Sequence, residues 1–319
     1  MAVYTSISLA DASRITQAHG LGAATALMPI AAGSVNTNYF VHGPFGKLFL
    51  RVYEEQEAQG VEYEWALLDH LDARGIPLPR RVRGTQPGEV RVAGKPTALF
   101  EVVGGEELCF RLVEPRHLAS VGDVLARIHL AGRDFPWRRA GRFQRKNIAE
   151  RLDDAARANR PELEAPIHEL RATLARLEAT PERPLPRGVI HGDLFRDNVR
   201  FEGTEIAAVL DWESASDGVL LYDLVVVFLA WCYGDDLDFE RGRALFDAYQ
   251  AVRPLEAVEW EALFDVAVEA AVRFSATRIT DFHLRGDDGS RVMKDYRRFL
   301  ARLAALEALG PEGLRSKLG

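Results

Sequence analysis

The spacing of apolar and polar positions changes about one third of the way along the chain. Before residue 104 the apolar residues come in short alternating runs between turn residues, which is typical of β-strands. We expect strands over 38–42, 47–53, 88–92 and 97–102, and helices over 9–19 and 57–74. This pattern predicts a small, mostly antiparallel sheet in a first domain, residues 1–103.

Helical spacing dominates the second domain, residues 104–319. Apolar residues recur there three and four positions apart, which places them on one face of each helix. We expect helices over 115–131, 161–178, 218–233 and 258–280, and short β-like runs over 188–190 and 206–210. The predicted fold class is therefore α+β, with a small antiparallel sheet lobe and a larger, mostly helical lobe.

Local signals mark several of these boundaries. Ser8 precedes the first helix, and Asp11 stands three residues later, a spacing that favours a capping pair. Gly20 and Gly75 follow the first two helices, where glycine is the usual residue. Val102–Gly105 has the composition of a linker between the two domains.

The segment His191–Asn198, with the sequence HGDLFRDN, carries the strongest chemical signal. Asp193 and Asn198 are five residues apart, and Asp211 follows at the end of an apolar run, within Val209–Glu213. Phosphoryl transfer needs a carboxylate that accepts the proton of the attacking hydroxyl, and hard oxygen ligands for Mg²⁺. We interpret Asp193 as the base, and Asn198 and Asp211 as the metal ligands.

Neighbouring residues have supporting or alternative roles. An isolated HGD would be an ordinary turn with a capping Asp, but the later Asn and Asp favour a catalytic loop. We expect His191 to brace this loop by hydrogen bonds, and Asp197 to be either functional or a plain loop carboxylate. Asp223 lies in an apolar helix and must be paired. We expect it to accept hydrogen bonds from backbone amides of the loop, the alternative being a side chain that reaches solvent.

Two features of the first domain suggest nucleotide phosphates as ligands. Gly33, Ser34 and Asn36 lie in a small-residue turn before a strand, and such turns can direct backbone amides at phosphate oxygens, although many are ordinary hairpins. Arg51 lies in the middle of a strand, opposite its apolar neighbours, where it could pair with the α- and β-phosphates. Glu64, on the next helix, could hold Arg51. The alternative is a solvent-facing arginine and a surface glutamate.

Glu101, just before the linker, and Val103, within it, complete the candidate nucleotide site. The expected cofactors are accordingly ATP and Mg²⁺.

Charge and cysteine content narrow the functional class. Forty Lys and Arg against 47 Asp and Glu give a net charge of −7, which argues against nucleic acid or an anionic membrane as a partner. Cys109 and Cys232 form neither a disulfide framework nor a CxxC zinc motif, as expected of a cytoplasmic protein. The longest apolar run is interrupted by Asp223 and is too short to span a membrane.

These residues resemble the aminoglycoside phosphotransferase-like family of small-molecule kinases, and within it the type II homoserine kinases. The HGDxxxxN and DWE elements are typical of the whole family. The branch is indicated by Met1–Thr5, Asn36–Tyr39, Leu68–Pro77, Leu221–Leu224, Ala230–Cys232, Arg273-Phe274, Arg278 and Asp281. Two positions depart from relatives: Arg51 stands where a lysine is usual outside this branch, and Asn36 is not preceded by an acidic residue.

The resemblance implies a kinase-like bilobal fold and an enzyme that phosphorylates L-homoserine to O-phospho-L-homoserine, a step of threonine biosynthesis. Arg278 is our candidate for the substrate carboxylate. The candidates for its ammonium group are Asp281, Glu213 and Asp217; Arg278 and Asp281 could equally form a structural pair on one helix face. Alternative acceptors are an amino alcohol, a sugar or an aminoglycoside. A non-catalytic nucleotide-binding protein remains a further alternative.

Overall fold

The computed structural model describes residues 5–30, 35–84, 90–286 and 293–319. The described chain forms two compact units. Unit 1 contains the described residues up to Gly104 together with Ala207–Glu213, and unit 2 contains the rest of the described chain. The sequence had assigned everything after residue 103 to the second domain. The contacts instead group Ala207–Glu213, which includes Asp211, with unit 1.

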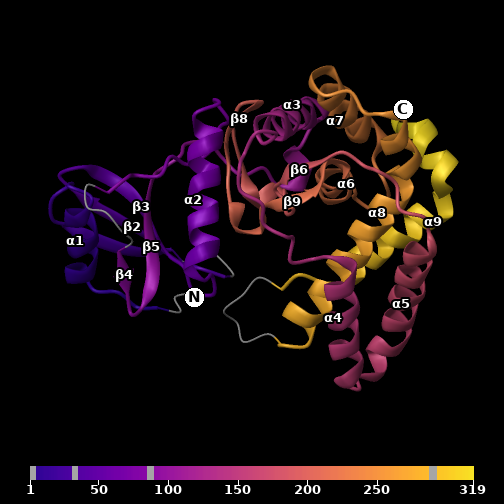
Figure 1. The fold of residues 1–319 in the computed structure, drawn as a ribbon, viewed down its shortest axis with the longest axis horizontal. Coiled ribbons are helices and arrows are strands. Elements are labelled where there is room, and N and C mark those ends of the chain that lie inside the picture. The colour runs from indigo at the N-terminus through magenta and orange to yellow at the C-terminus, as the bar shows by residue number, and fades with distance from the viewer. Residues whose placement is uncertain (1–4, 31–34, 85–89, 287–292) are drawn as a thin grey trace. The chain divides into compact units, whose positions relative to one another are not determined.

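Unit 1 is built on a five-stranded antiparallel sheet, with the strand order β1-β2-β3-β5-β4 (Figure 1). Its central strands are in a register that places Leu50 of β3 opposite Tyr39 of β2 and Leu99 of β5. All three side chains are buried. The strands are β1 (Ala26–Ile30), β2 (Thr37–Gly43), β3 (Gly46–Val52), β4 (Arg91–Val92) and β5 (Lys95–Glu101).

The two faces of this sheet are covered by different helices. Helix α1 (Leu9–Ala18) packs Ile15 against the face formed by Leu50 and its same-face neighbours. Because successive side chains of a strand alternate in direction, Arg51 points to the opposite face. Helix α2 (Ala58–Asp72) lies on that face, with Glu64 beside Arg51. The alternating direction of side chains along β3 thus places the apolar core on one face of the sheet and the Arg51–Glu64 pair on the other.

Unit 2 is mostly helical. Helix α6 is buried along nearly its whole length, because its sequence is apolar around the full circumference. It is packed against α3, α7 and α8, which surround it in Figure 1. The helices are α3 (Pro115–Ala131), α4 (Arg145–Arg157), α5 (Glu164–Ala179), α6 (Leu220–Trp231), α7 (Phe239–Val252), α8 (Ala257–Arg278) and α9 (Arg297–Leu318).

Two small β-structures frame the loop that carries the HGD sequence. Strand β6 (Arg187–Ile190) pairs with β9 (Ser216–Val219), and the loop begins directly after β6. The loop ends in a short 3₁₀ turn, Arg196–Asn198, after which β7 (Val199–Glu202) and β8 (Glu205–Val209) form a hairpin. Strands therefore fix both ends of the segment.

The predicted fold class is confirmed, since the chain has a small antiparallel sheet and a larger, mostly helical part. The capping pair is also confirmed: Ser8 Oγ accepts a hydrogen bond from Asp11 N, and Asp11 accepts one from Ser8 N. Six of the described helices and strands had no predicted range, namely β1, β7, β9, α4, α7 and α9. Pro29 weakens the strand signal of β1, and α4 buries only Ile148, Leu152 and Ala155.

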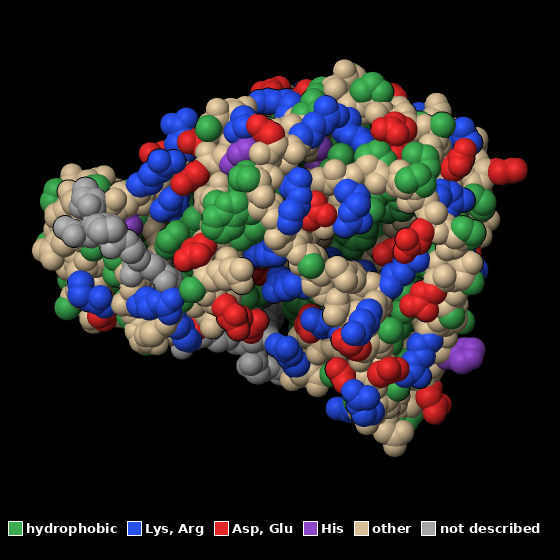
Figure 2. All heavy atoms as spheres, viewed as in Figure 1, with side chains coloured by type: hydrophobic (Ala, Val, Ile, Leu, Met, Phe, Trp, Pro, Cys, Tyr) green, Lys and Arg blue, Asp and Glu red, His purple; other side chains and the backbone are tan. Residues whose placement is uncertain are grey.

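Charges on the visible surface are mixed. Figure 2 shows Lys and Arg side chains interspersed with Asp and Glu side chains over the face in view. Among the described residues, no helix is both long and apolar enough to cross a membrane.

Candidate active site

The loop after β6 is held from behind by a single buried carboxylate. Asp223 Oδ2 accepts a hydrogen bond from His191 N at 2.6 Å, and Oδ1 accepts one from Gly192 N at 2.7 Å. This confirms the expectation that Asp223 binds backbone amides of the loop. Gly192 has φ = +77°, a conformation that glycine adopts without strain. His191 Nδ1 also accepts a hydrogen bond from Asp193 N at 3.3 Å, so His191 braces the loop as expected.

A chain of buried polar groups extends behind Asp223. His129 Nε2 lies 3.3 Å from Asp223 Oδ2, and His129 Nδ1 lies 2.7 Å from the Tyr249 hydroxyl. Arg253 donates to that hydroxyl at 3.1 Å and forms two hydrogen bonds to Glu259, at 3.0 and 3.1 Å. A neutral His129 protonated on Nε2 satisfies both contacts, because Tyr249 then donates to Nδ1. The HGD loop is thereby tied to α3, α7 and α8.

Asp193 is partly open and is contacted by a cation. Its side chain is 29% exposed, and its Oδ1 accepts a hydrogen bond from Arg273 Nη1 at 3.1 Å. The Arg273 guanidinium lies between two rings, 3.9 Å from the centroid of Phe143 and 3.7 Å from that of Phe274. Stacking on two rings fixes the plane of the guanidinium. Asp193 Oδ2 has no hydrogen bond to any described residue, and it can accept a proton from a substrate hydroxyl.

Asn198 is oriented by the backbone of Asp193. Its Nδ2 donates to the Asp193 carbonyl oxygen at 2.9 Å. The Asn198 side-chain oxygen is then left to act as an acceptor or a metal ligand. One short loop therefore fixes both a carboxylate and an amide oxygen.

In unit 1, Asp211 lies beside Arg51 in an unusual backbone conformation. It has φ = +61°, which non-glycine residues seldom adopt and which often marks a functional position. Its side chain is 40% exposed, and its Oδ1 is 4.0 Å from Arg51 Nη1. A partly exposed carboxylate of this kind suits Mg²⁺, which prefers oxygen ligands. Among the described residues, no group of three or more His, Cys, Asp or Glu side chains is arranged to hold a metal.

Arg51 and Glu64 form the pair that the sequence suggested. Arg51 Nη1 lies 3.6 Å from Glu64 Oε1, and Arg51 Nε donates to Asn38 at 3.4 Å. Burial opposes the charge on Arg51, but Asp211 and Glu64 outweigh it and raise its pKa. Burial raises the pKa of Glu64, an effect that Arg51 partly offsets. Tyr53 also donates to Glu64, at 3.1 Å.

Asn36 connects the turn before β2 to the DWE element. Its Nδ2 donates to Glu213 Oε2 at 2.8 Å, and its Oδ1 accepts from Glu54 N at 3.2 Å. Both Asn36 and Glu213 are buried. This pairing makes Glu213 a structural partner of Asn36 and leaves it less suited to an ammonium group. Gly33 and Ser34 lie outside the described residues.

The two candidates at the linker, Glu101 and Val103, occupy different settings. Glu101 is the exposed last residue of β5, and its backbone N–H donates to the Arg80 carbonyl at 2.9 Å. Val103 is half-buried in the extended stretch that follows. Their proposed contact with nucleotide stays a prediction.

Arg278 and Asp281 do not pair with each other. Arg278 Nη1 donates to the Asp295 carbonyl at 3.0 Å, whereas Asp281 Oδ1 accepts from Arg151 of α4 at 2.7 Å. The reason is that α8 passes into a π turn at Ile279–His283. A π turn has the i→i+5 hydrogen-bond pattern, so residues three apart no longer share one helix face.

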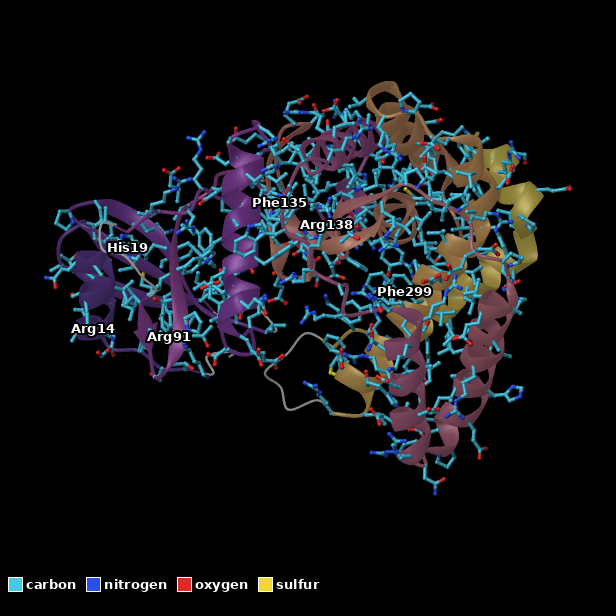
Figure 3. The ribbon with its side chains drawn as sticks, viewed as in Figure 1. Arg14, His19, Arg91, Phe135, Arg138 and Phe299 are labelled. Atoms are coloured by element: carbon cyan, nitrogen blue, oxygen red, sulfur yellow. The ribbon has the colours of Figure 1, made fainter. Side chains whose placement is uncertain are left out.

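Asp217, in β9, already has two cationic neighbours. It lies 3.7 Å from Arg138, which is labelled in Figure 3, and 3.5 Å from Arg187. These arginines neutralise the carboxylate, so Asp217 is a poor candidate for binding a substrate ammonium group.

Sequence reasoning did not assign two residues that the structure places at this site. Arg273 contacts Asp193 from 80 residues away, and His129 contacts Asp223 from 94 residues away. His129 carries a usable signal, because it follows Leu125 by four residues on the apolar face of α3. A histidine on a buried face must find a polar partner.

Comparisons with known proteins agree with this architecture. Residues 26–255 match the model of the phosphotransferase enzyme family. The fold is similar to that of a spectinomycin phosphotransferase solved with ADP and spectinomycin. That similarity has a TM-score of 0.68 at 13% identity and covers 97% of this chain and all of that one. The chain therefore belongs to the phosphotransferase enzyme family, and it is a small-molecule kinase that uses a hydroxyl acceptor.

Closer relatives are proteins named homoserine kinase. The protein of Methylobacillus flagellatus is 37% identical, over 89% of this chain and 88% of its own length. That of Methylocella silvestris is 36% identical, over 97% of both chains.

Proposed function

We propose that the protein transfers the γ-phosphate of ATP to the hydroxyl of L-homoserine, giving ADP and O-phospho-L-homoserine. The observation that carries the chemistry is Asp193, a partly open carboxylate whose loop and side chain are both fixed by buried partners, Asp223 and Arg273. The homoserine kinase relatives support the choice of acceptor. The product belongs to threonine biosynthesis, and we place the enzyme in the cytoplasm, where ATP is supplied.

In the proposed reaction the homoserine oxygen forms a bond to the γ-phosphorus, and the bond between that phosphorus and its bridging oxygen to ADP breaks. Asp193 orients the attacking hydroxyl and accepts its proton. Asn198 and Asp211 are the proposed Mg²⁺ ligands, and bound Mg²⁺ would neutralise charge on the β- and γ-phosphates.

Arg51 is proposed to pair with nucleotide phosphates, and Glu64 to hold its guanidinium in place. With Asn36, Glu101 and Val103, these groups make residues 1–103 the proposed nucleotide-binding part of the chain. Residues 104–319 are proposed to carry the base and the acceptor site.

A polycationic acceptor fits less well. Arg273 touches Asp193, and Arg278 is close enough to Asp193 that this carboxylate raises the pKa of Arg278 against a larger lowering by burial. Two arginines beside the base would repel an aminoglycoside and attract an acceptor that carries a carboxylate. The spectinomycin enzyme therefore shows the shared fold and not this chain's acceptor.

The choice of acceptor is tested with a coupled assay of ADP release. We expect kcat/KM for L-homoserine to exceed the values for 4-hydroxybutyrate and 2-aminoethanol by about 10⁴, since each analogue leaves polar groups of the site unpaired. Comparable rates with all three acceptors, or good turnover only with an aminoglycoside, would reject homoserine and leave the kinase assignment standing.

The metal assignment predicts that tight nucleotide binding depends on Mg²⁺ and on Asp211. Asp211→Ala should weaken Mg²⁺-dependent ATP binding by about tenfold or more, because a carboxylate ligand is lost. Isothermal titration of ATP with and without Mg²⁺ measures this, and Asp72→Ala, an exposed change on α2, is the control. If Mg²⁺ does not alter binding to the wild type, Asn198 and Asp211 are not its ligands.

A further inference from the structure

Four arginines gather next to the HGD loop in unit 2. Arg196 belongs to the 3₁₀ turn of the loop, Arg278 ends α8, and Arg298 and Arg302 lie on α9. The guanidinium carbons of Arg278 and Arg302 lie 4.5 and 4.7 Å from the centroid of the same ring, that of Phe299 (labelled in Figure 3). We call these four residues the arginine cluster.

The buried members of the arginine cluster are held mainly by backbone carbonyls and aromatic rings. Arg278 and Arg302 are 9% and 6% exposed, and both donate only to backbone carbonyls among the described residues: Arg278 to Asp295, and Arg302 to Leu229 and Arg298. Their side chains form no salt bridge with a described carboxylate. Arg196 Nη1 is buried and has no hydrogen-bond partner among the described residues.

Such an arrangement is electrostatically unfavourable without a ligand. Burial and the charge of Arg298 lower the pKa of Arg278 to about 10, and burial and the charges of Arg278 and Arg298 lower the pKa of Arg302 to about 9. Arg278 and Arg302 therefore remain protonated at neutral pH. Buried cations that repel one another destabilise a fold unless an anion compensates them.

We propose that the arginine cluster binds the carboxylate of the acceptor substrate, with Arg278 as its main ligand. A guanidinium presents parallel N–H donors that match the two oxygens of a carboxylate. Arg278 lies within electrostatic range of Asp193, and Arg196 is three residues from Asp193 along the loop. An acceptor held here by its carboxylate is therefore held close to the base. This inference rests on the proposed function, because it requires an acceptor with a carboxylate.

The inference replaces the pairing suggested by sequence, in which Arg278 and Asp281 held the two charged groups of the substrate. Asp281 is neutralised by Arg151. Arg278 instead contacts a backbone carbonyl and the Phe299 ring, and the nearby charges of Arg298 and Arg273 favour an anion over an ammonium group.

The decisive experiment changes the ligand and the protein together. Wild type, Arg278→Met and Arg298→Met are assayed with L-homoserine and with L-homoserinamide, which keeps the hydroxyl and the ammonium group but lacks the charged carboxylate. We expect the wild type to prefer homoserine by at least about 100-fold in kcat/KM, since each charged hydrogen bond contributes about tenfold or more. Arg278→Met should reduce the preference to within about tenfold, and Arg298→Met should reduce it partly.

Arg297→Met is the matched control, because Arg297 is adjacent to Arg298 but its side chain is 64% exposed and faces Asp295. It should keep the wild-type preference. If the preference survives in Arg278→Met and Arg298→Met, the arginine cluster does not bind the carboxylate. Equal losses of kcat/KM with homoserine and homoserinamide in these variants would also overturn the inference, since they would indicate that the arginines bind the transferred phosphoryl group.

Two readouts are independent of turnover. The melting temperature of ligand-free Arg278→Met should equal or exceed that of the wild type, because an uncompensated buried cation is removed; a fall of several degrees would show a structural role instead.

If the wild type does not phosphorylate homoserine, the proposed function fails, and binding of L-2-aminobutyrate to the wild type and to Arg278→Met then decides the inference. Arg278-dependent calorimetric binding of that carboxylate supports the site, and its absence overturns it.

Discussion

Asp193→Asn is expected to lower kcat by about 10²- to 10⁴-fold. Asparagine keeps the size of the side chain, and its amide oxygen can still accept the hydrogen bond from Arg273. It cannot accept the proton of the acceptor hydroxyl. KM for both substrates should change much less than kcat, because the fold of the loop depends on Asp223 and His191 and not on the Asp193 carboxylate.

Asp197→Asn is the matched control for this change. Asp197 lies in the same loop, is half exposed and faces Lys294 at 3.6 Å. A surface ion pair of this kind contributes little, so kcat should stay within about twofold of the wild type. Steady-state kinetics and far-ultraviolet circular dichroism of both variants are the measurements. Near-normal turnover in Asp193→Asn would exclude Asp193 as the base.

Asp223→Ala is expected to have the largest effect on stability. The change leaves His191 N and Gly192 N without their buried acceptor and removes the partner of His129 Nε2. Each buried donor left without an acceptor costs about 1–3 kcal/mol of unfolding free energy, and the loop that carries Asp193 loses its support. We therefore expect both a lower denaturant midpoint and a large loss of kcat.

Asp235→Ala serves as the control, since Asp235 is exposed shortly after α6 and makes no hydrogen bond to a described residue. It should leave stability within about 0.5 kcal/mol of the wild type. Urea unfolding followed by tryptophan fluorescence compares the variants. An Asp223→Ala protein as stable and active as the wild type would contradict the role given to this carboxylate.

Local sequence patterns predicted the structure correctly where residues close together in the sequence determine it. The α1 capping pair depends on Ser8 and Asp11 alone, and α3 spans the range its apolar spacing indicated. The Asp223 contact was also predictable, because a buried carboxylate must find donors and the loop is the segment that offers them. Periodicity failed for α4, whose buried stripe is narrow, and for β1, where a proline interrupts the strand pattern.

The remainder of the site depends on contacts between distant segments. Nothing in the local sequence around Arg273 indicates that it will lie between Phe143 and Phe274 against Asp193. The interpretation of Arg278 and Asp281 assumed regular α-helical geometry. The π turn after α8 turned these side chains towards different partners, and a single extra residue in a helical turn leaves no clear trace in the apolar pattern.

The central claim is that a nucleotide phosphate is transferred to the hydroxyl of homoserine. ³¹P nuclear magnetic resonance of the purified protein with ATP, Mg²⁺ and L-homoserine tests it most directly. The account predicts that the γ-phosphate signal is lost while a phosphomonoester signal of O-phospho-L-homoserine grows in equal amount, and that Asp193→Asn abolishes the change on the same timescale. Release of inorganic phosphate alone, or an unchanged spectrum with homoserine and a new phosphomonoester with another hydroxylated acceptor, would contradict it.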